Sequence, residues 1–124
     1  MQNLTSDQLA ELTFDNSAVT EMNVNPASKT LTIQCDRAFL DRGDDTVEIH
    51  NVIISVTGYD DIQARIYDDE SFVNVEVADE TYHLAEICEF TADGKKTMFS
   101  GFSNQEGAWS DYTIEGGVFA VAHR

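Results

Sequence analysis

Two short acidic clusters, each beginning with a tyrosine, are the parts of this sequence best suited to binding chemistry. A carboxylate beside an aromatic ring is typical of a site that holds Lys or Arg at a protein interface. We therefore predict that both clusters contact a partner, although Asp is also common at solvated turns. The predicted partner-binding residues are Tyr59, Asp60, Asp61, Tyr67, Asp68, Asp69 and Glu70.

The residues that bind metals are present but are not arranged as ligand sets. The three histidines, His50, His83 and His123, are isolated from one another, and no pair has the short spacing of a zinc site. The acidic stretch 41–48 lacks the acid spacing and the glycine position of a calcium-binding loop. We predict no metal site and no cofactor.

The motifs of common catalytic sites are also missing from the sequence. Ser100 lies in a Phe-Ser-Gly-Phe-Ser stretch rather than in a nucleophile elbow, and no base is evident near it. The Gly116-Gly117 pair has neither the third glycine nor the following lysine of a phosphate-binding loop. With 23 Asp and Glu residues, a pair of carboxylates carries no information about hydrolysis. We predict that the protein is not an enzyme and has no catalytic residues.

The charge of the chain restricts the classes of partner. Its 124 residues include 23 acidic and 7 basic side chains, for a net charge of −16. Such a field repels phosphate backbones and anionic lipids and attracts basic proteins. We therefore predict a basic protein partner, and neither nucleic acid nor membrane. Residues 36–80 alone hold 13 acids and three arginines, so the middle third carries most of the charge.

The two cysteines and the start of the chain predict a cytoplasmic protein. Cys35 alternates with Leu31 and Ile33 and is expected to face a core, and Cys88 lies in a second strand-like run. We interpret both as free thiols, while a disulfide between them stays open. Residues 1–4 lack the basic and apolar regions of a signal peptide.

The spacing of apolar residues predicts one domain over 1–124, with a short helix at 5–13 and an antiparallel β region at 18–123. Thr5 and Gln8 form a capping-box pattern for the helix. Residues 58–61 are expected to form a turn, and Gly116-Gly117 a tight hairpin. The expected strands are 18–24, 30–35, 46–57, 62–66, 72–77, 81–91, 97–103, 109–115 and 118–123. This number of strands is typical of a mainly β fold, either an antiparallel β-sandwich or a partly open barrel of about nine strands.

Several short motifs add a family likeness. The run Phe14 to Val19, the segment 29–33, the run Val47 to Val52, and later Gly101-Phe102 and Trp109 resemble a group of small acidic all-β bacterial domains. That group is associated with immunity proteins of polymorphic and contact-dependent toxin systems. The resemblance implies a cytosolic protein that binds and neutralises a cognate toxin domain without catalysis of its own.

The charge and the resemblance together predict an acidic protein-binding module. Its expected partner is a toxin domain, for which a nuclease is the leading candidate, and its carboxylates are expected to occlude the nucleic-acid-binding or active site. Reversing Asp68 and Asp69 to Lys is then expected to weaken binding and to reduce its salt dependence. The alternative is a homo-oligomeric structural or accessory β-domain assembled through a sheet edge, and a homodimer stays open. Trp109 is interpreted as a core or rim residue at one end of the fold, and a platform for a ligand is the alternative.

Overall fold

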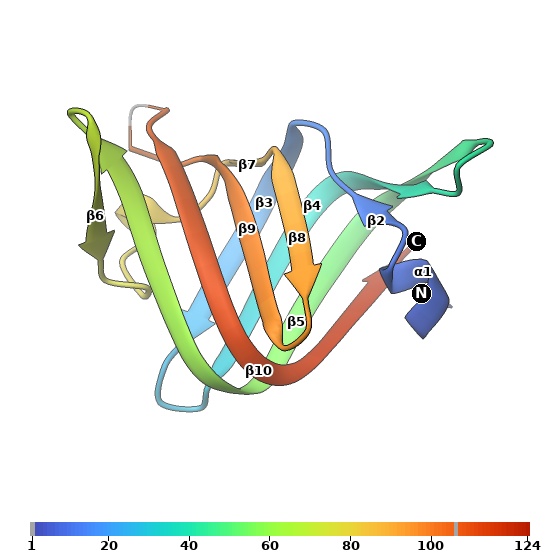
Figure 1. Cartoon of the computed structure of the whole chain (residues 1–124), viewed down its shortest axis with the longest axis horizontal. Helices are drawn as coiled ribbons and strands as arrows, with labels where there is room; N and C mark the ends of the chain where they lie inside the picture. The colour runs from blue at the N-terminus through green and yellow to red at the C-terminus, as the bar shows by residue number, and fades with distance from the viewer. Residues whose placement is uncertain (1, 106) are drawn as a thin grey trace.

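The structure is a computed structural model that describes residues 2–105 and 107–124. It contains one antiparallel sheet of ten strands that bends back on itself (Figure 1). The mainly β prediction is confirmed, and the single open sheet corresponds to the partly open alternative rather than to two stacked sheets. The elements are β1 (Gln2–Asn3), α1 (Ser6–Leu9), β2 (Leu12–Thr13), β3 (Ser17–Asn25), β4 (Thr30–Asp41), β5 (Thr46–Asp68), β6 (Ser71–Val75), the 3₁₀ helix η1 (Glu80–Tyr82), β7 (Glu86–Ile87), β8 (Glu89–Asp93), β9 (Lys96–Phe102) and β10 (Trp109–His123).

The two longest strands, β5 and β10, pair with each other and bend at the same level. A register shift after Glu115 places Gly116 opposite Tyr59. Gly58, Gly116 and Gly117 have φ angles of 67°, 73° and 88°, which glycine adopts without steric cost. The predicted turn at 58–61 and the predicted hairpin at Gly116-Gly117 are therefore wrong. Each is a bend inside a continuous strand.

This bend divides the sheet into two arms that face each other (Figure 1). The first arm consists of β3, β4, the first half of β5 and the last half of β10. The second arm consists of the rest of β5 and β10, together with β9 and β8. Strand β6 pairs only with the end of β5, so it forms an outer edge of the second arm.

Residues 84–88 tie the second arm to the first. The amides of Ala85 and Cys88 donate to the carbonyls of Phe102 and Ser100 in β9, over 2.7 and 2.8 Å. On its other side the same segment pairs with β3 through β7. A Cβ atom at Gly101 would overlap the carbonyl oxygen of Glu86, so glycine is required for this close approach.

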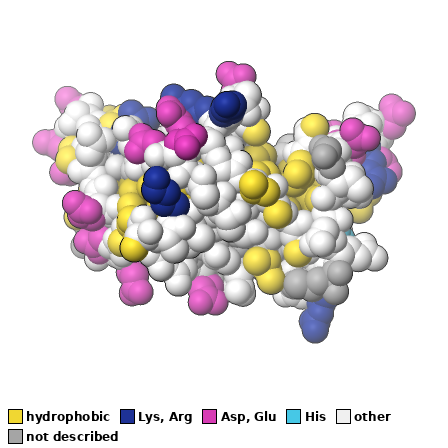
Figure 2. All heavy atoms as spheres, turned by 90° about the horizontal axis from the view of Figure 1, so that it is seen from below, with side chains coloured by type: hydrophobic (Ala, Val, Ile, Leu, Met, Phe, Trp, Pro, Cys, Tyr) yellow, Lys and Arg dark blue, Asp and Glu magenta, His cyan; other side chains and the backbone are white. Residues whose placement is uncertain are grey.

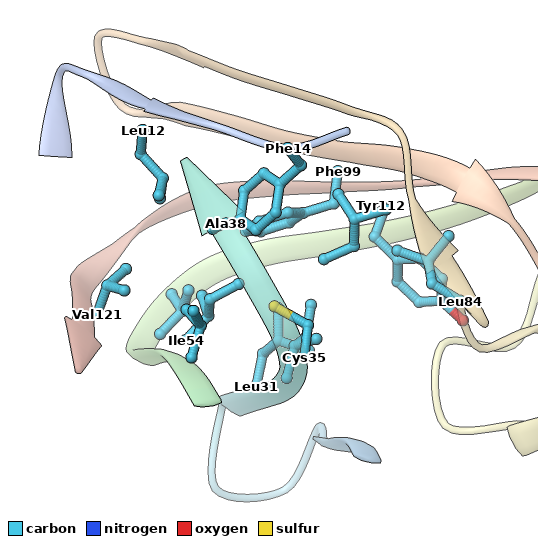
Figure 3. Packing of buried hydrophobic residues seen from close by; sticks show 14 of the residues in the cluster. Leu12, Phe14, Leu31, Cys35, Ala38, Ile54, Leu84, Phe99, Tyr112 and Val121 are labelled. Carbon is cyan, nitrogen blue, oxygen red and sulfur yellow. The ribbon is translucent and has the colours of Figure 1, made fainter. Parts of the chain in front are cut away.

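The core lies between the arms. Leu31, Cys35 and Ile54 project from the first arm toward Phe99 and Tyr112 of the second (Figure 3). The predicted inward face of Leu31, Ile33 and Cys35 is confirmed, because all three are at most 2% exposed. Since both arms bury their inner faces, the side chains that alternate with core residues point outward.

The N-terminal helix is shorter than predicted. The capping box at Thr5 and Gln8 forms, with both reciprocal hydrogen bonds in place. However, α1 ends at Leu9, and Leu12 instead pairs with Leu40 of β4, because a strand edge offers it backbone partners and a core. No helix in the described part of the chain is long and apolar enough to cross a membrane.

The predicted strand at 81–91 is the other element that the structure divides. It consists of η1, β7 and β8, because the chain must turn from the edge of one arm to reach the other. The remaining hairpin prediction is confirmed: β3 and β4 pair around the turn that follows Asn25. The antiparallel sheet also includes β1 and β2, which pair with β10 and β4 and lie before the region predicted at 18–123.

Candidate partner-binding surface

The first predicted cluster lies at the bend of β5. Tyr59 is only 4% exposed, and its hydroxyl has no hydrogen-bond partner among the described residues. Burial raises the pKa of this phenol, and the nearby charge of Asp61 raises it further. Asp60 and Asp61 are exposed, with Asp60 placed against Gly116. The structure therefore corrects the aromatic part of this prediction, because a core tyrosine offers no surface for a partner.

The second predicted cluster forms the tip of the β5–β6 hairpin. Asp68 pairs with Ser71 around a two-residue turn, in which Asp69 and Glu70 have φ angles of 48° and 76°. Positive φ at both central residues defines a type I′ turn, which matches the twist of the flanking strands. Tyr67 is 45% exposed, and Asp68, Asp69 and Glu70 are exposed as well. The tyrosine and the acids of this cluster therefore share one accessible site.

The two clusters do not converge. Tyr59 and Tyr67 are eight positions apart on the same strand. At the rise of an extended chain this corresponds to about 26 Å. The hairpin tip is therefore the candidate site, and the acids at the bend contribute to the field around it.

Four aromatic side chains form a row beside this tip, across four neighbouring strands. Phe72 of β6 lies opposite Tyr67 of β5, and Phe102 of β9 lies opposite Trp109 of β10. Ser110 pairs with Ile66, so the next position along places Trp109 opposite Tyr67. We call Phe72, Tyr67, Trp109 and Phe102 the aromatic row. Tyr67, Trp109 and Phe102 lie on the outer face, because they alternate with buried residues of their strands, and Phe72 shares this face as the cross-strand partner of Tyr67.

The rings of the row meet in two edge-to-face pairs. The centroids of Tyr67 and Phe72 are 5.3 Å apart, and those of Phe102 and Trp109 are 5.4 Å apart. Their planes cross at 69° and 89°. Such pairs add about 0.5–1.5 kcal/mol beyond simple burial, so they hold the rings in place before a partner arrives.

Arg65 and Asp111 lie beside the row on the same outer face. Arg65 donates two hydrogen bonds to the Asp111 carboxylate, over 3.0 and 2.9 Å. Its guanidinium carbon also lies 4.4 Å from the centroid of the Phe72 ring. Asp111 raises the pKa of Arg65 through this hydrogen bond, so the cation is firmly held. The charge of Arg65 is thereby paired with that of Asp111, and the tip keeps its negative charge.

The sequence around the tip contains no opposing charge. Residues 66–94 include nine acids and no Lys or Arg. Figure 2 views the molecule from below, at the end opposite the β5–β6 tip of Figure 1; on that face Asp and Glu side chains lie mainly around the periphery, and Lys and Arg side chains lie among them. At the tip itself, the exposed aromatic row beside the acids is complementary to a surface that is itself basic.

The two thiols hold their protons tightly, and the side chains that could bind a metal are dispersed in the described part of the chain. Both cysteines are free thiols, and burial with the nearby Asp36 raises the pKa of Cys35 to about 12. Cys88 is partly buried, and its pKa is raised by burial and by the charge of Glu86. Neither is therefore an activated nucleophile. Among the described residues, no three His, Cys, Asp or Glu side chains lie together as a metal site requires.

Comparison of the chain with protein-family models, with curated proteins and with solved structures gives no match. The surface must therefore be interpreted from its own geometry.

Of the aromatic row, only Tyr67 is predicted from the sequence as a binding residue. Phe102 enters only through the family likeness, and Phe72 and Arg65 are not among the predicted residues. Trp109, interpreted as a core or rim residue, is partly exposed within the row, as a rim residue is. A signal was present in the sequence, since Phe102 and Trp109 flank the polar loop that joins their strands. The pairing of β10 with β5, which joins the two aromatic pairs, had no comparable signal.

Proposed function

We propose that the protein is a non-catalytic binding module that neutralises a basic protein partner. The observation that carries this proposal is the aromatic row beside the acidic tip formed by Asp68, Asp69 and Glu70. Aromatic residues supply most of the binding energy at many protein interfaces, and acids around them select a cationic partner. The proposed role is that of an immunity protein, as the family resemblance implies.

The row fits protein side chains better than flat ligands. Because its rings cross at 69° and 89°, neighbouring rings do not make one continuous plane on which a sugar or a base could lie. The edges and faces that they expose instead form ridges and hollows, which suit aliphatic stems and guanidinium groups. The net charge of −16 argues against a nucleic acid in the same position.

The proposed mechanism is occlusion. A nuclease-type toxin domain would present a basic groove for its substrate, and the acidic tip would occupy that groove in place of phosphates. Attraction between opposite fields would raise the association rate toward ~10⁸ M⁻¹s⁻¹ at low salt, while the aromatic row would slow dissociation. In this role the protein would act in the cytoplasm, where the substrate of such a toxin is found.

Self-association is the second candidate, because β6 leaves a free sheet edge. Charge disfavours it. Two copies joined through β6 would bring together two segments that are rich in acids and lack Lys and Arg. Like charges opposite one another across strands are destabilising.

Affinity capture from the native cells, with matched charge-reversal variants as baits, tests the proposal. The informative bait carries Asp68→Lys and Asp69→Lys. The control carries Asp44→Lys and Asp45→Lys, which make the same charge change at the exposed β4–β5 turn, far from β6 (Figure 1). We expect one basic protein to be retained through moderate salt by the wild type and the control, and to be lost from the informative bait.

Two results would contradict the proposal. If both charge-reversal variants lose the protein equally, binding follows total charge rather than the tip. If every captured protein leaves at moderate salt, the acids only solvate the surface. Size-exclusion chromatography with light scattering provides the remaining comparison, since a stable homo-oligomer without added partner would favour self-association.

A further inference from the structure

We infer that the partner binds by adding an extended, basic segment to the free edge of β6. This inference rests on the proposed function and specifies how the partner is held. It follows from three features of the hairpin: its unpaired backbone groups, the apolar side chains at its centre, and the acids at both of its ends.

The register of the β5–β6 hairpin determines which backbone groups are free. Asp68 and Ser71 close a two-residue turn and so form a hydrogen-bonded pair. Pairs then alternate, so Val73 and Val75 bond to β5 while the N–H and C=O groups of Phe72 and Asn74 point away from it. Outside the strand ladders, no hydrogen bond within the described residues involves the backbone of Phe72 or Asn74. The edge therefore offers a row of donors and acceptors to another strand.

The side chains of β6 give this edge two apolar faces. Phe72 is 45% exposed on the outer face, beside Tyr67, and Val73 is 45% exposed on the inner face. Val73 is exposed because no strand lies beyond β6, although its partner Ile66 on β5 is buried. A strand added to β6 would cover both residues with alternate side chains. The Arg65 guanidinium already covers one face of the Phe72 ring, so an added strand would contact the part of the ring that stays exposed.

Acids at both ends of β6 favour an incoming segment with a positive charge. Asp68, Asp69 and Glu70 precede the strand, and Glu76, Asp79 and Glu80 follow it. No Lys or Arg lies in this whole stretch. An incoming segment with basic residues at its ends and apolar residues at its centre is complementary to this pattern in either direction. A second copy of β6 is not, because its ends carry the same acids.

The probe for this inference is a capped peptide of about eight residues with arginines at both ends and valines at its centre. Its control replaces each arginine by glutamate. We expect the arginine peptide to bind and the glutamate peptide not to bind. Amide hydrogen exchange then locates the contact, because the Phe72 and Asn74 amides are expected to exchange fast in the free protein and at least about tenfold more slowly in the complex.

Two substitutions at Asn74 distinguish the contribution of its backbone N–H to peptide binding from that of its side chain. Asn74→Pro removes the outward N–H without removing a bond to β5, whereas Asn74→Ala removes only the side-chain amide. We expect Asn74→Pro to weaken peptide binding by about tenfold or more, and Asn74→Ala to change it by less than about twofold. The exchange measurement on the unmodified protein does not depend on how well either variant folds.

The outcomes separate this inference from the proposed function. Absence of arginine-peptide binding, or binding without protection of Phe72 and Asn74, would overturn strand addition at β6. Equal losses of peptide affinity in Asn74→Pro and Asn74→Ala would also overturn it. If the captured partner is lost on reversal of Asp68 and Asp69 but unaffected by Asn74→Pro, the edge inference fails while the binding function stands.

Discussion

The substitution Gly101→Ala is expected to disrupt the contact that joins the two arms of the sheet. The φ angle of Gly101 is not in the left-handed region, so the reason for glycine at this position is space alone. An added Cβ would overlap the Glu86 carbonyl oxygen and lie 2.9 Å from its carbon and 3.1 Å from the Cys88 nitrogen. Residues 86–88 would therefore have to move away from β9 by about 1.5 Å to restore ordinary contact.

The energetic cost follows from what this movement breaks. Overpacking of a well-packed site costs about 1–3 kcal/mol. The movement also weakens the bonds that Ala85 and Cys88 donate to β9, each worth about 1 kcal/mol. We expect the free energy of unfolding to fall by about 3 kcal/mol in urea titrations. The midpoint of thermal unfolding should fall by about 10 °C for a chain of this length.

Gly58→Ala is the matched control for this prediction. Gly58 has a φ angle of 67°, but an added Cβ would meet nothing within 4 Å. Its cost is conformational strain alone, about 1 kcal/mol. Amide exchange distinguishes the two variants further, because only Gly101→Ala should accelerate exchange at Ala85 and Cys88. Equal costs for the two substitutions, or unchanged exchange at these amides, would refute the steric argument.

Three further predictions concern side chains that are held by burial. Asp111→Asn should lower the free energy of unfolding by about 1–2 kcal/mol in urea, because Arg65 loses a charge-assisted bidentate partner; an unchanged value would mean that the pair is solvated. At pH 8 an aromatic disulfide reagent should modify Cys88 slowly and Cys35 only after unfolding, since the pKa of Cys35 is about 12; equal rates in the native protein would contradict this. The free energy of unfolding should decline as pH rises from about 9 toward 12, because the native state keeps the Cys35 proton that the unfolded chain releases near its ordinary pKa of 9.0. The raised pKa of Tyr112 acts in the same direction. The substitution Cys35→Ala should make this decline less steep.

The sequence predicts the pairing of strands across short turns, but it does not predict that β5 and β10 continue through their bends. The difference has a physical reason. A glycine beside polar residues lowers the cost of reversing the chain, which is why 58–61 and Gly116-Gly117 were interpreted as turns. In the structure these glycines face each other on paired strands, and each supplies only part of the bend. Two such glycine positions can form two separate hairpins, or they can form one bend that is common to two paired strands. The outcome depends on which strands are neighbours in the sheet. Periodicity along a single strand contains no information about its neighbours.

The candidate site is likewise predictable from the sequence only where it depends on local properties. The exposed tip at Tyr67 to Glu70 was identified from sequence because its turn chemistry and its charge are both local properties. Tyr59 had the same local sequence pattern but became a core residue, because the bend turns that stretch of β5 toward the interior. Identical local patterns on one strand can therefore have opposite exposures when a bend separates them.

The aromatic row illustrates how tertiary pairing combines two local features into one surface. Each of two hairpins is flanked by an aromatic pair, Tyr67 with Phe72 and Phe102 with Trp109. Either pair alone would be an ordinary cross-strand contact that stabilises its hairpin. Because β5 and β10 pair without interruption over this region, the two contacts become a single row that ends at the free edge of β6. The same pairing that forms the fold thus places the exposed rings beside the acidic turn at Asp69 and Glu70, at the free edge of β6.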